Sequence, residues 1–425
     1  MNRPPVLRTI KIRKIMEEFL SFVDNKKIKA LIHAWLDMGE MMLACGAEVN
    51  RVEDTLSRVA HAYGAIKADV FVITSSIVLT ATFPEERIYT MSRRITGGGG
   101  SDFIKLEEVN ALSRRICSEP MSTEKLLDEL KKINDRKDYT AVKGILGSGF
   151  AAGAFAVFFG GSLLDGIMAV LMGMLVWVAS YFLAKVVPNK VTFNLICSFG
   201  VAMIICIIGL IMGGMQVDKV AIGVIMLLIP GIAITNAVRD TILGDTISGT
   251  LKLIQSLLMA FMIAAGFMLA IKISGVDATH ISASDGAYQL LPGVLGSIGF
   301  ALIFNLKVKY LPYIAAASFF AWGIYLICEL NFGLGVFWCS LISGIFSDVS
   351  SQLLARIKKA PATLFLISTV IPLIPGSCLY YSAYYLVTDS RGDFAHYAMT
   401  TVLAVLGLAL GIGFSAGVFS MFKKR

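Results

Sequence analysis

The chain has 425 residues, of which 56% are hydrophobic and only 16% are charged, and its formal net charge is +8. A soluble domain usually carries about 25% charged residues, so a chain that is soluble throughout is excluded. Residues 1–140 hold 22 of the 38 Lys and Arg residues and 20 of the 30 Asp and Glu residues. The rest is an apolar body in which runs of about 20 apolar residues, long enough to cross a bilayer, recur.

The positive charge does not indicate a nucleic-acid partner. Basic and acidic residues nearly balance in the first 140 residues, and the excess beyond them lies mostly between apolar runs, where membrane topology requires it. The seven cysteines form no C-x-x-C pair, the four histidines form no H-x-x-x-H pair, and no phosphate-binding loop is present. The sequence therefore predicts no metal site, no cofactor and no catalytic residues.

The N-terminal part predicts a basic segment, 1–28, and a small cytoplasmic α+β domain, 29–140. Runs rich in Val, Ile, Thr and Phe, separated by turn residues, indicate three strands between two pairs of helices. The expected order is helices at 29–43 and 48–63, strands at 68–74, 77–83 and 87–94, and helices at 105–118 and 123–134. Four charged residues at helical spacing either gate the cytoplasmic mouth of the body or form ion pairs: Glu48, Arg51, Glu53 and Asp54.

The apolar body predicts an α-helical polytopic membrane protein with ten transmembrane helices. The expected spans are 143–160, 163–184, 191–214, 219–243, 247–272, 288–306, 309–329, 332–355, 361–388 and 397–421. With the N-terminal domain in the cytoplasm, each inner connection carries at least two basic residues, whereas the outer ones carry at most one each, namely Lys219, Lys272 and Arg391. This bias places both termini in the cytoplasm and the chain in the cytoplasmic membrane.

A short motif divides the body into two halves. Leu-Ile-Pro-Gly at 228–231 recurs at 373–376, an offset of 145 residues that places the first five spans on the last five. The predicted halves are 141–275 and 286–425. Because each half has an odd number of spans, the two must have opposite orientations in the membrane. The sequence thus predicts two inverted five-helix repeats, an arrangement that recurs in secondary transporters.

The repeated Pro-Gly pairs lie inside long apolar segments. Proline removes a backbone donor and glycine weakens a helix, so each pair predicts a broken helix. Matched interruptions of this kind are the best sequence pointer to a transport site. Pro230, Gly231, Pro375 and Gly376 are therefore candidate site residues, with a packing kink that holds no ligand as the alternative.

Polar residues follow the first break closely. Arg239 offers a planar guanidinium to a substrate carboxylate, and Asp240 or Asp245 offers a carboxylate to an amino group or a proton. Asn236 belongs to the same polar stretch. The alternative is a capped helix turn at the cytoplasmic surface, with Arg239 as a topology anchor and Asp245 capping the fifth span.

Two further candidates lie in the second half. Tyr381 belongs to a group of tyrosines that follows the second break, and it either lines the substrate path or joins an interfacial aromatic belt. Asp348 lies inside the eighth expected span, where an ionised group is costly and a proton-carrying role is the default. Its alternative role is a structural pair with Arg356, two helical turns later.

Several of these motifs together resemble the bacterial threonine/serine exporter family. They are Gly46-Ala47-Glu48 with Arg51 to Thr55, Gly160-Gly161-Ser162 with Asp165, Pro230-Gly231 with Thr235 to Ala237 and Arg239-Asp240, Gly244-Asp245 with Ser248-Gly249, and Leu373 to Gly376. The resemblance covers about residue 30 to the C-terminus and looks like the fused form of a two-module exporter. It implies export of small hydrophilic metabolites driven by the proton motive force, with threonine or serine as substrate.

Other functions stay open on the sequence. Split relatives in this family are associated with dicarboxylates, which makes a dicarboxylate exporter the first alternative. A membrane-anchored enzyme with its active site in the N-terminal domain is the second, although that domain shows no catalytic motif, and a passive channel is the third. We expect a small-molecule substrate, protons and the lipid bilayer as partners, and the sequence leaves open whether the chain forms a homo-oligomer.

Overall fold

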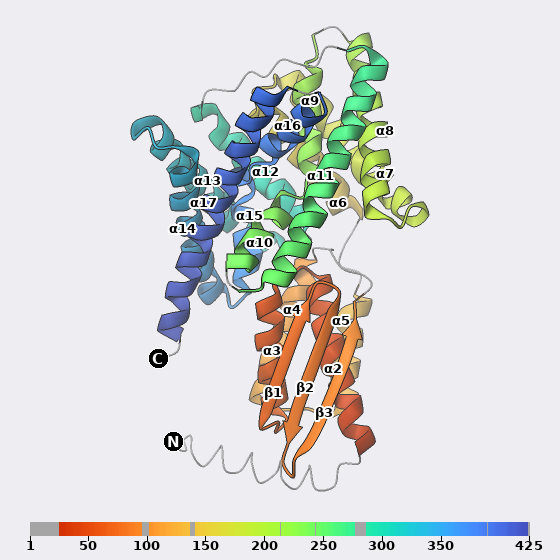
Figure 1. Ribbon diagram of the computed structural model, residues 1–425, viewed down its shortest axis with the longest axis vertical. Coiled ribbons are helices and arrows are strands. Elements are labelled where there is room, and N and C mark those ends of the chain that lie inside the picture. The colour runs from red at the N-terminus through yellow and green to blue at the C-terminus, as the bar shows by residue number, and fades with distance from the viewer. Residues whose placement is uncertain are drawn as a thin grey trace. The chain divides into compact units, whose positions relative to one another are not determined.

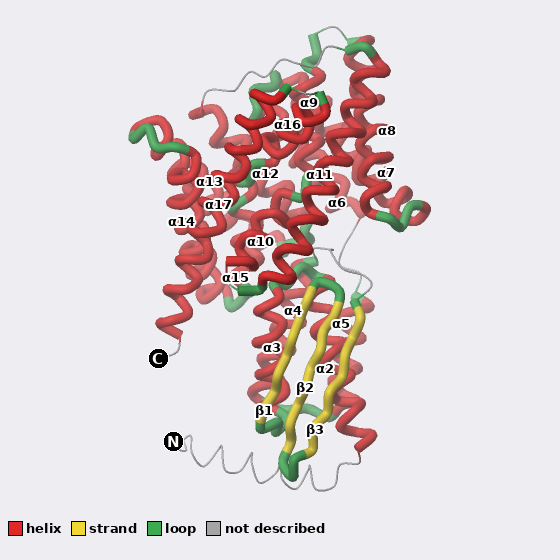
Figure 2. The backbone as a smooth tube through the Cα atoms, viewed as in Figure 1, coloured by secondary structure: helices red, strands yellow, loops and turns green. Residues whose placement is uncertain are grey.

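The computed structural model describes residues 25–95, 102–136, 141–212, 214–242, 244–276, 286–388 and 390–423. The chain divides into two compact units, Met1–Asp138 and Tyr139–Arg425, whose elements are shown in Figures 1 and 2. Of the predicted basic segment 1–28, residues 1–24 lie outside the described residues. Its last four residues begin the first described helix.

The N-terminal unit has the predicted α+β order. Its elements are α2 (Asn25–Ala44), α3 (Val49–Ala62), β1 (Lys67–Ile73), β2 (Ser76–Phe83), β3 (Arg87–Arg94), α4 (Phe103–Ser118) and α5 (Thr123–Asp135). The strands form an antiparallel sheet in the order β1-β2-β3. Alternate residues of β2, from Ile77 to Phe83, are buried beneath α2 and α3, and the helices cover one face of the sheet (Figure 2). Period-2 alternation along β2 thus sets which face is buried.

The second unit is helical throughout its described residues. Its first half contains α6 (Ala141–Phe158), α7 (Leu163–Val186), α8 (Lys190–Ile211), α9 (Val217–Leu228), α10 (Gly231–Ile242) and α11 (Thr246–Ser274). Its second half contains η1 (Gly286–Gln289), α12 (Leu290–Ile303), η2 (Val308–Tyr310), α13 (Leu311–Leu326), η3 (Ile327–Asn331), α14 (Val336–Lys358), α15 (Ala362–Thr369), η4 (Ile371–Leu373), α16 (Gly376–Val387) and α17 (Arg391–Lys423).

Both predicted helix breaks are confirmed. The chain bends by 47° between α9 and α10, where Ile229 and Pro230 separate the two helices, and by 46° in the α15–α16 segment. A proline has no N–H to donate to the preceding turn, which ends the helix there. In Figure 1, α9 and α16 lie toward one end of this unit and α10 and α15 toward the other. The chain therefore passes through the two breaks in opposite directions.

Nine of the ten expected spans are long and apolar enough to cross a membrane within the described part of the chain. Seven are single helices and two are the bent pairs. The remaining expected span, 332–355, corresponds to α14. Its 23 residues are long enough to cross a membrane, but they are not apolar enough. Five serines and Asp348 lower its hydropathy, because α14 turns a polar stripe toward neighbouring helices. The structure thus shows a polytopic membrane protein with seven to nine candidate spans.

Helix contacts repeat between the two halves. α8 packs on α11 as α14 packs on α17, and α6 packs on α7 as α12 packs on α13. Contacts between the halves are also reciprocal, because α10 packs on α17 while α16 packs on α11. α6 and α12, the first helix of each half, pack on one another, and a Cβ on Gly299 would lie 2.6 Å from the backbone N of Ala151. Small residues permit this close approach.

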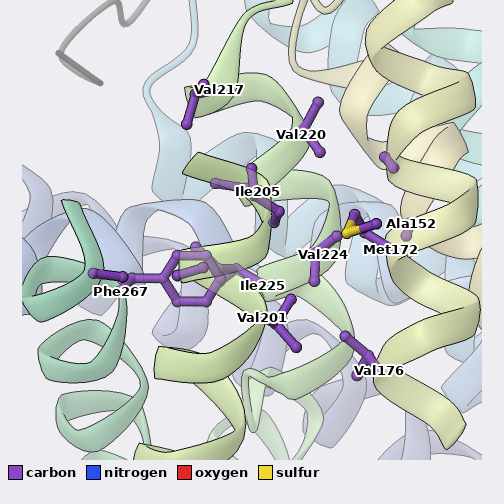
Figure 3. Packing of buried hydrophobic residues seen from close by; sticks show 14 of the residues in the cluster. Ala152, Met172, Val176, Val201, Ile205, Val217, Val220, Val224, Ile225 and Phe267 are labelled. Atoms are coloured by element: carbon purple, nitrogen blue, oxygen red, sulfur yellow. The ribbon is translucent and has the colours of Figure 1, made fainter. Parts of the chain in front are cut away.

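The largest described core of this unit surrounds α9. Val217, Val220, Val224 and Ile225 project from α9 toward side chains of α6, α7, α8 and α11, among which Phe267 is the largest labelled in Figure 3. Every side of α9 therefore meets protein rather than lipid. A helix that is buried in this way can tolerate polar residues at its ends.

Candidate functional site

The two broken helices meet at their repeated motifs. A Cβ atom placed on Gly231 would overlap Cγ2 of Ile374, so only glycine leaves room for that side chain. A Cβ atom placed on Gly376 would lie 2.8 Å from Sδ of Met226 and 3.5 Å from Cγ2 of Ile229. Each glycine thus lies against a side chain of the other half: Gly231 leaves room for Ile374, and Gly376 leaves room for Met226, with Ile229 at ordinary contact distance. The glycines are required for close approach rather than for backbone conformation.

Two helices begin at the breaks, so their first backbone N–H groups lie there. α10 begins at Gly231 and α16 begins at Gly376, so both helices start at the contact between the halves. The carbonyl of Pro230 accepts from Ile234 N–H at 3.0 Å, and the carbonyl of Pro375 accepts from Leu379 N–H at 3.0 Å. The amino ends of both helices carry partial positive charge. An anionic group is therefore stabilised near this contact.

Charged residues gather at the far end of α10. Lys252 Nζ on α11 donates to Asp240 Oδ2 at 2.7 Å, and an Arg239 guanidinium nitrogen lies 3.7 Å from Asp240 Oδ1. Arg239 and Asp240 are only 4% and 2% exposed. This burial disagrees with the surface-anchor alternative for Arg239, and Asn236 lies half-buried one turn earlier. Lys252 was missed as a site residue, because its partner on α10 becomes apparent only when α10 and α11 pack together.

Asp245 lies beside this ion pair, in the turn between α10 and α11. It occupies the N-cap position of α11, but its side chain makes no capping hydrogen bond. Its Oδ2 is buried and accepts no hydrogen bond from the residues that the structure describes. Burial and the nearby charge of Asp240 raise the pKa of Asp245, and Lys252 opposes this shift. Asp245 therefore holds a proton more readily than an exposed aspartate does.

Asp348 lies in a different interface, between α14 and α17. It is 2% exposed, and Ser415 Oγ on α17 donates to its Oδ2. Four buried serines share this region of α14: Ser340, Ser343, Ser347 and Ser351. The guanidinium of Arg356 lies 5.1 Å from the centre of the Phe419 ring. Sequence alone could not identify Ser415 as the partner, because it is 67 residues away.

Tyr381 belongs to a cluster of tyrosines on α16 and α17. Ring centroids of neighbouring members lie 5.1–6.4 Å apart, and the members are Tyr380, Tyr381, Tyr384, Tyr385 and Tyr397. Tyr380 is buried and its ring contacts Phe267 of α11, whereas Tyr385 and Tyr397 are half-buried. The cluster therefore extends from the core of the unit toward its surface.

A buried ionic group at the start of α9 was missed by sequence reasoning. Lys219 is 1% exposed and Asp218 is 8% exposed, with Lys219 Nζ 3.5 Å from Asp218 Oδ2. The sequence predicts Lys219 in an outer connection, whereas the structure places it in the first turn of α9 with its side chain buried. Charged residues next to an apolar run usually mark its boundary, but here they lie inside the first turn of α9 and point into protein.

Asp165 fixes the position of this first turn. Its carboxylate accepts from the N–H and hydroxyl of Ser162, both at 2.7 Å, and from Gln216 N–H at 2.8 Å. The bond from Ser162 N–H, together with the bond that Asp165 N–H donates to Ser162 Oγ at 3.2 Å, forms a capping box at the start of α7. The bond from Gln216 N–H ties α7 to the residue just before α9. Gly161 lies against Cβ of Lys219, so the Gly-Gly-Ser turn is fitted to the same region.

The four charged residues of the N-terminal unit belong to α3 or precede it. Glu53 accepts from Val72 N–H of β1 at 2.9 Å, and Asp54 pairs with Arg58 at 2.8 Å. Glu48 is the N-cap of α3. Burial is the main cause that lowers the pKa of Arg51, while the Glu48 carboxylate opposes the shift. At least Glu53 and Asp54 therefore stabilise the unit itself.

Among the described residues, the candidate residues form separate groups. Pro230, Gly231, Pro375 and Gly376 meet at the breaks, while Arg239, Asp240 and Asp245 lie together near Lys252. Asp348 and Tyr381 belong to two further interfaces. No group of three or more metal-ligating side chains occurs in the described part of the chain.

Comparison with known proteins identifies the family of this chain. A family model described as "Putative threonine/serine exporter" matches residues 33–274, and a second, described as "Threonine/Serine exporter, ThrE", matches residues 289–418. The chain belongs to the threonine/serine exporter family. The gap between the two matches falls between α11 and α12, so this family member carries both modules on one chain.

Two relatives in this family match most of the chain at low identity. The "Threonine/serine exporter" of Corynebacterium glutamicum is 22% identical over 402 residues, which cover 87% of this chain and 78% of the relative. The "Probable threonine/serine exporter" of Mycobacterium tuberculosis is 21% identical over 422 residues, covering 93% and 77%. No solved structure matches the chain. Because the relatives are named as exporters, the prediction of a membrane transporter that is not an enzyme is confirmed.

Proposed function

We propose that this protein is a secondary transporter that exports threonine or serine across the cytoplasmic membrane, driven by the proton motive force. Its family membership supports an exporter, and the names of both relatives support the substrate. Buried carboxylates in the helical unit support coupling to protons, because such groups are costly to bury in membrane helices and usually mark ion or proton pathways. Both termini and the N-terminal unit lie in the cytoplasm, as the distribution of basic residues indicates.

The helical unit functions as two inverted five-helix repeats that together span the membrane ten times. The reciprocal helix contacts support this symmetry, as do the opposite chain directions at the two breaks. α14 serves as the tenth span, shielded from lipid on its serine-rich face by α17. Relative movement of the two repeats exposes a central site first to one side of the membrane and then to the other.

The transport site lies at the contact between the two breaks. The observation that carries this proposal is the contact between the repeated motifs, in which Gly231 leaves room for Ile374 and Gly376 lies against Met226 and Ile229. The amino ends of α10 and α16 bind the substrate carboxylate there. Any change in the angle of one break changes the space available at the other. The contact therefore couples the two repeats mechanically.

Protons pass through the cluster at the end of α10. Asp245 carries the proton, because its pKa is raised and its Oδ2 has no described donor. Asp240 and Lys252 hold the opposing charges beside it, and Asn236 and Arg239 lie on the same short helix. Asp348, which Ser415 orients, provides a second protonation site in the other repeat.

The N-terminal unit gates the cytoplasmic mouth of the transporter through α3. Glu48, Arg51, Glu53 and Asp54 carry this function in addition to their contacts within the unit. The support is that all four lie at the start of α3, with Glu48 as its N-cap. Substitution that retains the fold and changes the transport rate would support the gate, and an unchanged rate would contradict it.

Transport by the purified protein in liposomes tests the proposal. An imposed pH gradient should drive accumulation of labelled threonine or serine, and a protonophore should abolish it. Accumulation of labelled succinate in place of both amino acids would favour the dicarboxylate alternative, which the buried Arg239 beside Lys252 makes chemically reasonable. Flux that does not respond to the pH gradient would indicate a passive channel.

A further inference from the structure

The helix pair α14–α17 repeats the packing of the pair α8–α11. A Cβ atom placed on Gly266 of α11 would meet the carbonyl oxygen of Leu195 on α8. In the second half, a Cβ atom placed on Gly411 of α17 would meet the carbonyl oxygen of Leu341 on α14. The two glycines are 145 residues apart, which is the offset of the repeated Leu-Ile-Pro-Gly motif. Positions counted from Leu195 and from Leu341 therefore correspond.

Corresponding positions on one face of α8 and α14 differ in chemistry. The positions two, six and ten residues after the leucine are compared. On α8 they belong to the apolar core around α9 (Figure 3), and the residues are Cys197, Val201 and Ile205. On α14 all three are serines that are 0% exposed, namely Ser343, Ser347 and Ser351. Because the first half packs the same arrangement with apolar side chains, packing does not account for the hydroxyls of α14.

The buried carboxylate of α14 also has no counterpart in the first half. Asp348 and its hydrogen-bond donor Ser415 correspond to Ala202 and Ala270. The two alanines are 1% and 0% exposed, so a pair of methyl groups is sufficient to pack these helices. A carboxylate is costly to bury in a membrane helix and usually marks an ion or proton pathway. The second half therefore adds a functional group that its fold does not require.

Charged residues on the elements around Asp348 lie at least two helical turns from it or from Ser415 along their helices. α13 and α15 pack on α14 and carry no charged residue, although α13 contributes the phenols of Tyr313 and Tyr325. The charged and histidine residues of η3, α14 and α17 are Glu329, Arg356, Lys358, Arg391, Asp393, His396 and Lys423. The residues next to Asp348 along α14 instead carry hydroxyls, at Ser347 and Ser351.

Four buried serines form a hydroxyl column along α14. The column consists of Ser340, Ser343, Ser347 and Ser351, about one turn apart, and it extends about 16 Å along the helix. The hydroxyls of Ser340 and Ser343 have no partner among the described residues. Those of Ser347 and Ser351 donate to backbone carbonyls at 2.7 and 2.6 Å and can still accept hydrogen bonds. Buried hydroxyls without partners destabilise a fold, and buried water binds to such groups.

We propose that water bound along the hydroxyl column passes protons from the amino end of α14 to Asp348. The proposal rests on the proposed function, in which this end of α14 faces the outside and protons enter as the amino acid leaves. Each water molecule accepts a proton on a lone pair and releases another to the next, and the Asp348 carboxylate accepts the last and becomes neutral. The column begins close to the surface, because Gly335, just before α14, is exposed. Proton entry thus belongs to the second repeat.

Two substitutions of the same shape test the path. Ser347→Val introduces the residue that α8 has at this position, and Ser347→Thr has the same shape but retains the hydroxyl. In liposomes that contain a pH-sensitive dye, Ser347→Val should take up protons about tenfold more slowly than Ser347→Thr when an outward threonine gradient is imposed, as for loss of one hydrogen bond from the path. Exchange of labelled threonine at equal pH should be retained in both, which shows that both are folded.

The control is Ser318→Ala on α13. Ser318 is also 0% exposed, but its hydroxyl donates to the Ala315 carbonyl at 3.2 Å, and the variant should take up protons at the wild-type rate. Equal proton uptake by Ser347→Val and Ser347→Thr would overturn the hydroxyl column alone. Wild-type protein in which threonine movement takes up no protons would overturn the proposed function and the column together.

Reaction of introduced cysteines gives a measurement that does not depend on transport. In a chain without the seven native cysteines, Ser343→Cys should react with a small charged thiol reagent added outside, because a hydrated thiol can ionise. Ile342→Cys should not react, although Ile342 is 37% exposed, because its neighbours in the membrane are lipid chains. Ser343→Cys that reacts no faster than Ile342→Cys would contradict a hydrated column.

Discussion

The two broken helices have the same mechanical design but different chemistry. In the first half, α9 and α10 carry buried charges at both ends, Asp218 with Lys219 and Arg239 with Asp240. In the second half, α15 and α16 carry no charged residue, and α16 presents tyrosines and serines instead. Yet both breaks bend by similar angles, and a glycine of each lies at the contact between them. In the proposed mechanism, the repeated motif allows the movement, and the first half supplies most of the charges that bind substrate and protons.

The largest effect should follow from filling the contact between the breaks. Gly231→Leu and Gly376→Leu each place a side chain where the other half already lies, and overpacking of this kind costs about 1–3 kcal/mol. Both should reduce transport in liposomes to less than about a tenth of wild type, since neither break can then move past the other. The matched control is Gly200→Leu, at an exposed position with open space around it. Loss of transport in only one of the two variants would show that the two breaks are not mechanically equivalent.

The second prediction concerns the buried ion pair of the first half, which has no charged counterpart on α15 or α16. Asp240→Asn leaves Lys252 and the buried Arg239 without their carboxylate partner, which costs about 3 kcal/mol for a buried pair. Transport should fall about tenfold and the temperature of unfolding should drop. Adding Lys252→Met should restore part of the lost stability, because Arg239 still lacks the Asp240 carboxylate, and should not restore transport. Wild-type transport rates in Asp240→Asn would contradict a role for this pair.

A third prediction concerns the pH dependence of Asp245. Its folded pKa is raised by burial and by Asp240, so the stability it contributes is fully present below its unfolded pKa of about 4 and is lost as pH rises through the folded pKa. Asp245→Asn cannot ionise, so the variant does not lose this stability as the pH rises. Thermal unfolding of the variant should therefore change less than that of wild type between about pH 4 and pH 7. Its transport should also lose the response to a pH gradient, whereas parallel unfolding curves would contradict the raised pKa.

The smallest effect should follow from removing the hydrogen bonds that hold the start of the first broken helix. Asp165 fixes the residue before α9, whereas the N-cap of α15 is Pro361, which makes no side-chain capping bond. Asp165→Asn removes the charged part of the capping box, at a cost of about 1–2 kcal/mol. The unfolding temperature should fall by a few degrees while substrate preference stays unchanged. A larger loss of transport than of stability would assign Asp165 a direct role.

Much of the fold could be predicted, because it rests on local patterns. The repeated Pro-Gly pairs located both breaks, and alternating and helical periodicity gave the order of elements in the N-terminal unit. The partners of the charged residues could not be predicted, because they depend on packing between distant segments, as for Asp240 with Lys252 and Asp348 with Ser415. The burial of Lys219 could not be predicted, because a charge at the edge of an apolar run is usually exposed and its neighbours here come from distant segments. The segment of α14 was predicted as a span, but its hydropathy is lower than that of the other spans because its serines and Asp348 face protein.

The most direct test is a reversible cross-link between the two breaks. Met226→Cys and Gly376→Cys, introduced into a chain without the seven native cysteines, place thiols on opposite sides of the contact. If the breaks must move against one another, oxidation should stop threonine transport in liposomes, and a reductant should restore it. Each single-cysteine chain should be unaffected by oxidation. Cross-linked protein that transports at the rate of the reduced protein would contradict the central claim that the two breaks form the moving transport site.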